Sequence, residues 1–307
     1  MNQNIRTLIL PVAMLVGFLF SGFFAALNPS TPYILFTMLF ITFCRISPSE
    51  MRFLPMIVWL ILMQVAGGVG VYLLLSVFDE TVAQGVAMCI YAPTAVAAMV
   101  IGGMLGANLA TMATMTFFSN LTVGILSPFL FSFVGQQTEL PFFDSFLAVI
   151  GRVGPLLLIP LFLSMLLRKV APKVHAAVRK RQDVSFYLWV AALAITTGQT
   201  VEFVIEQDSG SYTIEIIIAA GAFAACILQF AAGRRLGRKY GDRISGGQSL
   251  GQKNTLLAIW MAQTYFHPLS SLGPASYVLW QNLVNTWQLW RHRENNSPAQ
   301  PRQKSVR

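Results

Sequence analysis

Residues 81–105 read TVAQGVAMCIYAPTAVAAMVIGGML, an apolar run that is long enough to cross a bilayer but is interrupted by Pro93. Proline lacks a backbone N–H and disfavours helix at the preceding Ala92, so the run predicts one half-helix on either side. Residues 245–266, SGGQSLGQKNTLLAIWMAQTYF, join a polar, glycine-rich half ending near Asn254 to a short apolar half. Neither half can cross a membrane alone, which predicts two broken spans. The alternative is a proline kink plus a short helix, since neighbouring groups can satisfy a freed carbonyl.

The composition of the whole chain indicates a membrane protein. Its 307 residues are 55% hydrophobic and 11% charged, with a mean hydropathy of +0.62, which is more apolar than one soluble core can bury. At roughly 20 apolar residues per span, the chain has room for about ten helices. Apolar runs lie at 8–27, 31–46, 54–76, 82–105, 109–134, 145–167, 184–204, 211–232, 249–267 and 270–290.

The distribution of charged residues predicts the orientation of the chain. If residues 1–7 lie in the cytoplasm, every Lys and Arg except Arg152 and Lys253 falls in a cytoplasmic segment, and the charged residues of the outer loops are all acidic. This asymmetry is typical of multi-pass inner-membrane proteins and predicts ten spans with both termini inside. The net charge of +9 then follows from topology and predicts no nucleic-acid partner.

A short sequence match between the two halves of the chain, called the internal echo below, predicts two repeats. Thr94 is followed by Asn120 after 26 residues, and Thr255 is followed by Asn282 after 27. Two copies of five spans each would be inserted in opposite senses. The predicted fold class is therefore an all-α membrane protein of ten transmembrane helices, arranged as two inverted five-helix repeats with broken crossing helices four and nine. A match this short can also arise by chance.

The predicted domain organisation is simple. Residues 1–294 form a single transmembrane transporter domain, with one repeat over about 1–135 and the other over about 142–294. Residues 295–307 are polar and rich in Gln and Pro, which predicts a disordered cytoplasmic tail.

Two cations, Arg152 and Lys253, are predicted to lie inside the membrane. An intramembrane charge is costly and indicates a functional site by default. Arg152 could instead extend to the outer interface near Asp144, and Lys253 could lie in cytoplasmic water with the polar half of its span. At the crossing, the Lys253 ammonium would meet the negative end of a half-helix, where a bound cation is otherwise needed. It is also a candidate for holding an anionic substrate or carrying a proton.

Uncharged polar residues complete the candidate substrate site. These are Gln64, Thr94, Thr116, Asn254 and Thr255. Each could equally serve as ordinary interhelical contact. Cys44, Cys89 and Cys226 lie in apolar runs without metal-like spacing, and we interpret them as core residues. The chain shows no nucleophile with a base and no metal-ligand cluster, so we expect no enzyme activity, no cofactor and no metal ion.

Several short motifs are spread along the chain. They are Thr37-Met-Leu-Phe through Arg45-Ile-Ser-Pro-Ser-Glu-Met, Met63-Gln64, Ala92-Pro93-Thr94, Gly106-Ala-Asn108 and Gly251-Gln-Lys-Asn-Thr-Leu-Leu-Ala258. In these motifs the chain resembles the bile acid:sodium symporter family, and the resemblance runs through most of its length. It implies ten helices in a panel domain and a core domain, with crossing broken helices four and nine. It also implies alternating-access transport, usually of amphipathic organic anions.

The resemblance further implies sodium sites, and here the chain departs from the family. Polar ligands expected in spans four and five are replaced by Ala98, Met99 and Met112, although Thr116 is retained. Ser249 stands where an acidic residue is expected, and Lys253 stands where a glutamine is expected. Sodium needs several oxygen ligands, and the methyl group of Ala98 and the thioethers of Met99 and Met112 do not supply them. We therefore expect sodium-independent transport of a small or amphipathic organic anion, with proton coupling or facilitated diffusion instead.

Two other functions remain open at this stage. A cation/proton antiporter-like carrier would need an intramembrane Asp or Glu near the crossing, and the predicted spans place none there. A non-transporting membrane receptor would show the same sequence features as a transporter.

Overall fold

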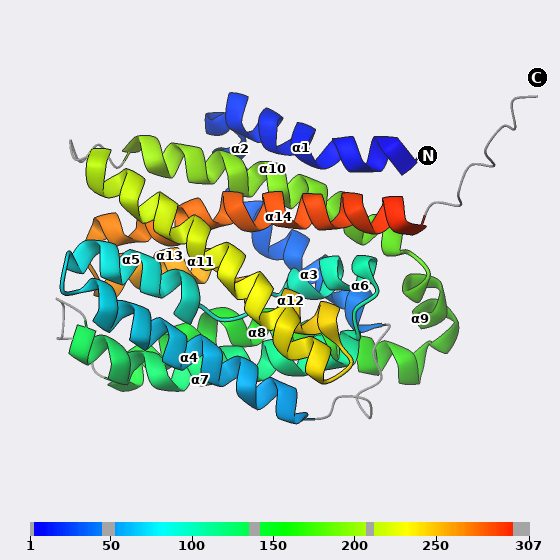
Figure 1. Cartoon of the computed structure of the whole chain (residues 1–307). Helices are drawn as coiled ribbons and strands as arrows, with labels where there is room; N and C mark the ends of the chain where they lie inside the picture. Colours follow the sequence, from blue (N-terminus) through cyan, green and yellow to red (C-terminus); the bar gives the residue numbers. More distant parts are fainter. Residues whose placement is uncertain (1–2, 45–52, 135–141, 207–211, 297–307) are drawn as a thin grey trace, which may run out of the picture.

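The computed structural model describes residues 3–44, 53–134, 142–206 and 212–296. Within these ranges the chain is helical, and its only β-type pairing is an isolated bridge between two residues. Long helices run alongside one another and surround a set of shorter ones (Figure 1). The predicted loop around 45–52 and the tail from 297 onward lie outside the described residues.

The helices of the first half follow the predicted spans closely. They are α1 (Gln3–Leu19), α2 (Ser21–Ala26), the 3-10 helix η1 (Asn28–Ser30), α3 (Thr31–Phe43), α4 (Pro55–Leu75), α5 (Glu80–Tyr91), α6 (Ala98–Leu105) and α7 (Leu109–Val134). The first predicted span is not continuous, because Phe20 leaves the helical conformation between α1 and α2.

The second half contains the remaining helices. They are α8 (Phe142–Val170), α9 (Pro172–Arg179), α10 (Gln182–Glu206), α11 (Tyr212–Lys239), α12 (Arg243–Gly251), α13 (Thr255–Tyr265), the 3-10 helix η3 (Pro268–Ser271) and α14 (Leu272–Asn296). No predicted span covers α9, and the predicted spans at 211–232 and 270–290 end before α11 and α14 do. Basic residues near a helix C-terminus interact favourably with the helix dipole. The basic residues that follow these apolar runs therefore stabilise further helical turns.

Four helices of the described chain are long and apolar enough to cross a membrane. The qualifying stretches are Pro55–Leu75, Leu109–Ser127, Asp183–Phe203 and Tyr212–Lys239. Large apolar side chains are exposed on the outer helices, among them Trp59, Leu74, Phe162 and Leu228. A surface of this kind is suited to lipid rather than to water.

Glycines bring both broken helices close to their neighbours. A Cβ placed on Gly246 of α12 would lie 2.4 Å from the carbonyl oxygen of Gly233 in α11. Beside the other broken helix, a Cβ on Gly273 of α14 would lie 2.3 Å from the carbonyl oxygen of Gly85 in α5. Small residues allow such backbone contact in membrane proteins, which explains the glycine-rich sequence before Lys253.

Candidate functional site

The two predicted interruptions are present, and they cross each other. The chain leaves helix between α5 and α6 and again between α12 and α13. An antiparallel bridge pairs Thr94 with Lys253 at the crossing. Ala95 N–H donates to the Gln252 carbonyl oxygen at 2.9 Å, and Asn254 N–H donates to the Pro93 carbonyl oxygen at 2.8 Å. In Figure 1, α5 and α13 lie toward one end of the molecule and α6 and α12 toward the other.

Side chains from the long helices α7 and α14 hold this crossing in place. Thr94 N–H donates to the Ser119 hydroxyl at 2.9 Å, and the Asn120 amide donates to the Thr94 carbonyl oxygen at 3.2 Å. In the other break, Lys253 N–H donates to Gln281 Oε1 at 2.9 Å. The extended backbone, which cannot bond within a helix, therefore finds its partners on neighbouring helices.

The Lys253 ammonium group lies inside the protein. The residue is 1% exposed, and its Nζ donates to the carbonyl oxygen of Ile90 at 2.8 Å. Ile90 belongs to the last turn of α5, where carbonyl groups lack a helical partner and carry the negative end of the helix dipole. The alternative that Lys253 lies in cytoplasmic water is therefore wrong.

Two glutamines cap the carbonyls on either side of Ile90. Gln229 Nε2 donates to the Cys89 oxygen at 3.1 Å, and Gln64 Nε2 donates to the Tyr91 oxygen at 2.9 Å. In an unbroken helix Pro93 would be the partner of Cys89, but proline has no N–H. An ammonium and two amides thus replace the hydrogen bonds that the break removes from α5.

The end of α12 is capped by hydroxyl groups instead. Thr94 Oγ1 donates to the Ser249 oxygen at 2.7 Å, and the Tyr277 hydroxyl donates to the Gly251 oxygen at 2.8 Å. Both half-helix ends at the crossing are therefore satisfied by side chains, but only the end of α5 receives a charged one.

A cavity of about 580 Å³ adjoins the crossing. It is lined by residues of both breaks and by α3, α10, α13 and α14, with polar groups such as Asn28, Gln199, Gln263 and Asn282 beside Trp189 and Trp260. Lys253 is the only charged residue in this lining, which consists of described residues. The cavity can hold a small organic molecule.

The region that contains both breaks matches a known protein family. The model of the SBF-like CPA transporter family (DUF4137) matches residues 46–283, which include both breaks. The chain belongs to this family. No curated protein matches it. Membership indicates a membrane transporter, and it confirms the resemblance to the bile acid:sodium symporters at the level of a related family.

The structure separates the predicted site residues of this SBF-like transporter into two groups. Lys253, Asn254 and Thr255 line the cavity. Gln64, Thr94 and Thr116 are fully buried and are absent from its lining. Gln64 and Thr94 cap half-helix ends, whereas the Thr116 hydroxyl has no hydrogen-bond partner. Arg152 lies in α8, but its side chain is outside the described residues, and substrate contact by any of these residues stays a prediction.

The contacts of the SBF-like transporter give two different registers for the internal echo. The sequence match pairs Thr94 with Thr255 and Asn120 with Asn282. At the crossing, Thr94 lies opposite Lys253 instead. Asn120 and Asn282 are alike, because each side-chain amide donates to the carbonyl oxygen four residues earlier in its own helix. The echo therefore stays a prediction.

Sequence reasoning missed Gln229, Tyr277 and Gln281 as residues of the crossing. All three are buried, and each bonds to a break or a half-helix end. Polar residues inside predicted spans were a usable signal for them, but that signal does not say which carbonyl each one meets.

Proposed function

We propose that this SBF-like transporter moves a small or amphipathic organic anion across the inner membrane without sodium, with the Lys253 ammonium in the place of a bound ion. The contact that carries the proposal is the 2.8 Å hydrogen bond from Lys253 Nζ to the Ile90 oxygen. The C-terminal end of α5 carries about half a negative charge, which favours a cation there. Lys253 supplies that charge from the protein itself when its amine is protonated, so a mobile cation is not needed.

The charges around the cavity favour an anionic substrate. The helices α6 and α13 begin at the crossing, and the residues that precede them line the cavity. Helix N-termini carry partial positive charge and bind anions. The lining holds one ammonium and no carboxylate. This set of groups disfavours a cation/proton antiporter-like carrier, which would need an intramembrane acid.

The position of the cavity suits alternating access. Its wall reaches Asn28 between α2 and α3 and Gln263 in α13, at the end where α5 begins. On the other side of the crossing, Met38 of α3, Ile101 of α6 and Phe186 of α10 belong to one buried apolar cluster. An apolar contact of this kind can separate when α3 and α10 move against the crossing helices, and that movement would open the other side.

The contacts at the crossing support inverted repeats of five helices. Lys253 reaches Ile90, four residues before Thr94, and Thr94 reaches Ser249, four residues before Lys253. This reciprocity is what a two-fold relation between opposite insertions produces. The beginning of α1, the end of α14 and α9 lie at one end of the molecule (Figure 1), as both termini in the cytoplasm require.

Uptake into proteoliposomes tests the function directly. The purified protein is reconstituted and offered a panel of radiolabelled organic anions, from short carboxylates to bile acids, with either sodium or choline outside. We expect uptake of at least one anion at similar rates in both salts. Strict sodium dependence would refute the ion-replacement mechanism. Saturable binding without uptake would favour the non-transporting receptor.

A stability measurement tests the role of Lys253 without a known substrate. In Lys253→Gln the Ile90 oxygen loses its cation, so we expect sodium to raise the melting temperature of this variant relative to choline. The wild type and the exposed-site control Lys239→Gln should show no such difference. Ligand binding stabilises by RT ln(1 + [L]/Kd), so sodium at about 100 times Kd adds about 2.7 kcal/mol. A sodium effect on the wild type would contradict the proposal.

A further inference from the structure

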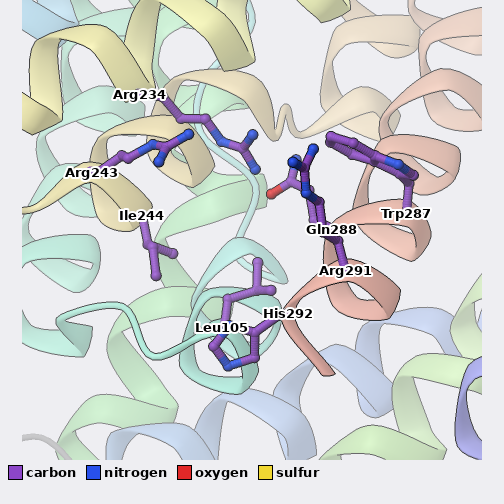
Figure 2. Close-up of a pocket in the computed structure, with 8 residues that line it drawn as sticks. All are labelled: Leu105, Arg234, Arg243, Ile244, Trp287, Gln288, Arg291 and His292. Carbon is purple, nitrogen blue, oxygen red and sulfur yellow. The ribbon is translucent and has the colours of Figure 1, made fainter. Parts of the chain in front are cut away.

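A second cavity lies away from the crossing. It has a volume of about 300 Å³ and lies between α11, α12 and α14, beside the end of α6 (Figure 2). Arg234, Arg243 and Arg291 line it, one from each of these three helices. Figure 2 shows Arg234 pointing from α11 toward Gln288 and Arg291 of α14. Gly247 of α12 leaves room for the Arg234 stem, since a Cβ there would lie 2.5 Å from the arginine Cγ.

The three guanidinium groups gather without a counter-charge. The positive charges of Arg243 and Arg291 both lie close enough to repel the positive charge of Arg234. The lining contains no Asp or Glu, and no ion pair joins these arginines to a carboxylate of the described ranges. The carboxylate of the nearby Asp242 accepts from Ser245 N–H as the N-cap of α12. Like charges held together repel, and an anion between them would remove that repulsion.

Gln288 adds an independent sign of a missing ligand. The residue is 5% exposed, and its Oε1 accepts from Gln248 Nε2 at 2.7 Å. Its Nε2 is buried and has no hydrogen-bond partner. Buried donors without partners are rare because they lose their water and gain nothing in return. The same pocket therefore offers three guanidinium groups and an unused amide donor.

We propose that this pocket binds a phosphate-class oxyanion, supplied by a soluble phosphate compound or by an anionic lipid headgroup. Guanidinium groups match phosphate oxygens with paired N–H donors, and the Gln288 amide provides a further donor. Because the pocket lies at the end of the molecule where α14 ends, the oxyanion comes from the cytoplasmic side in the proposed orientation. This site is separate from the central cavity.

A chain of glutamines connects the pocket to the crossing. Gln288 accepts from Gln248, and Gln248 in turn accepts from Gln252 Nε2. Gln252 lines the central cavity, and its carbonyl oxygen accepts from Ala95 N–H. An oxyanion that fixes Gln288 therefore also restrains the break between α12 and α13.

Calorimetric titration of the purified full-length protein with pyrophosphate, at constant ionic strength, tests the site without any transport assay. Arg234→Gln and Arg291→Gln should each raise Kd by about tenfold or more, since a hydrogen bond to a charged group contributes at least that much. Arg235→Gln is the matched control, because it removes the same charge from an exposed neighbour outside the pocket. Gln288→Leu keeps every charge and should still weaken binding several-fold.

A lipid arm distinguishes the source of the oxyanion. The same variants are placed in nanodiscs of phosphatidylcholine with or without phosphatidylglycerol, and melting temperatures are compared. Pyrophosphate binding that depends on Arg234 identifies a soluble ligand, whereas stabilisation by phosphatidylglycerol that depends on Arg234 identifies a lipid headgroup. If neither probe responds to the pocket variants, or if Arg235→Gln acts as strongly as Arg234→Gln, the proposal is overturned. Because uptake is not measured, this failure is separate from failure of the transport proposal.

Discussion

The two breaks that cross at the centre of this transporter share a geometry but differ in chemistry. The break at 92–97 is mostly apolar and follows from Pro93, whereas the break at 252–254 consists of Gln, Lys and Asn. Each break sends one side chain to the end of the other half-helix. Thr94 supplies a hydroxyl to α12, and Lys253 supplies an ammonium to α5.

This difference places the only charge of the crossing at one helix end. The last carbonyls of α5 meet Lys253, Gln64 and Gln229, while those of α12 meet the hydroxyl groups of Thr94 and Tyr277. The shared geometry of the two breaks therefore does not impose equal chemistry on the two helix ends. In the proposed mechanism, one substitution at the charged end changes the ion coupling, and the neutral end serves as its internal control.

The largest effect is expected where the backbones of α11 and α12 meet. In Gly246→Val the new Cβ would lie 2.4 Å from the Gly233 oxygen, and backbone cannot yield as a flexible side chain does. Overpacking typically costs about 1–3 kcal/mol, and occasionally more. Because the clash here is with backbone, we expect little monodisperse protein by fluorescence-detected size-exclusion chromatography. Gly70→Val is the control, since nothing lies within 4 Å of its Cβ position.

The same substitution in α14, where it packs against the other broken helix, sharpens the comparison. Gly273→Val would place a Cβ 2.3 Å from the Gly85 oxygen of α5. If the two half-helices are equally locked, both variants should fail together. A folded Gly246→Val protein would show that α12 can shift away from α11 and that its glycines are not a packing requirement.

A smaller effect is expected when the uncharged cap of α12, the Thr94 hydroxyl, is removed. Thr94→Val keeps the shape of the side chain but leaves the buried Ser249 oxygen without its donor, so the free energy of unfolding should fall by about 1–2 kcal/mol. Equilibrium unfolding in mixed detergent micelles measures this change. Thr94→Ser should restore most of it. In Thr42→Val the lost bond is to Met38 within the same helix, so this control should change stability much less.

The positions of the breaks could be predicted from sequence, but their partners could not. Pro93 and the polar run before Asn254 act locally, because each disturbs the helix in which it lies. The partner of Lys253 is a backbone oxygen 163 residues away, and no side-chain pattern marks it. The burial of Lys253 was open for the same reason, since the polar half of its span could equally have lain in water.

The second cavity, lined by three arginines, shows what an assignment of charges to the two sides of the membrane cannot predict. Arg234, Arg243 and Arg291 were each assigned to a cytoplasmic segment, which explained their charge one at a time. Their convergence depends on how α11, α12 and α14 pack, and that packing rests on glycine contacts that the sequence shows only as small residues. Counting charges by side of the membrane therefore predicted orientation and concealed a candidate site.

The smallest effect is expected at the N-termini of α6 and α13, the half-helices that follow the two breaks. Asn254 accepts from Leu257 N–H as the N-cap of α13, whereas Ala97 at the start of α6 makes no side-chain cap. Asn254→Ala should lower the free energy of unfolding by about 1 kcal/mol. Ala97→Ser should change it by less than about 0.5 kcal/mol, because Ala97 has helical backbone angles and a capping side chain needs an extended residue. Both are measured by the same micelle unfolding. A gain of stability in Ala97→Ser comparable to the loss in Asn254→Ala would mean that the two starts are equivalent, and that the breaks differ only at their carbonyl ends.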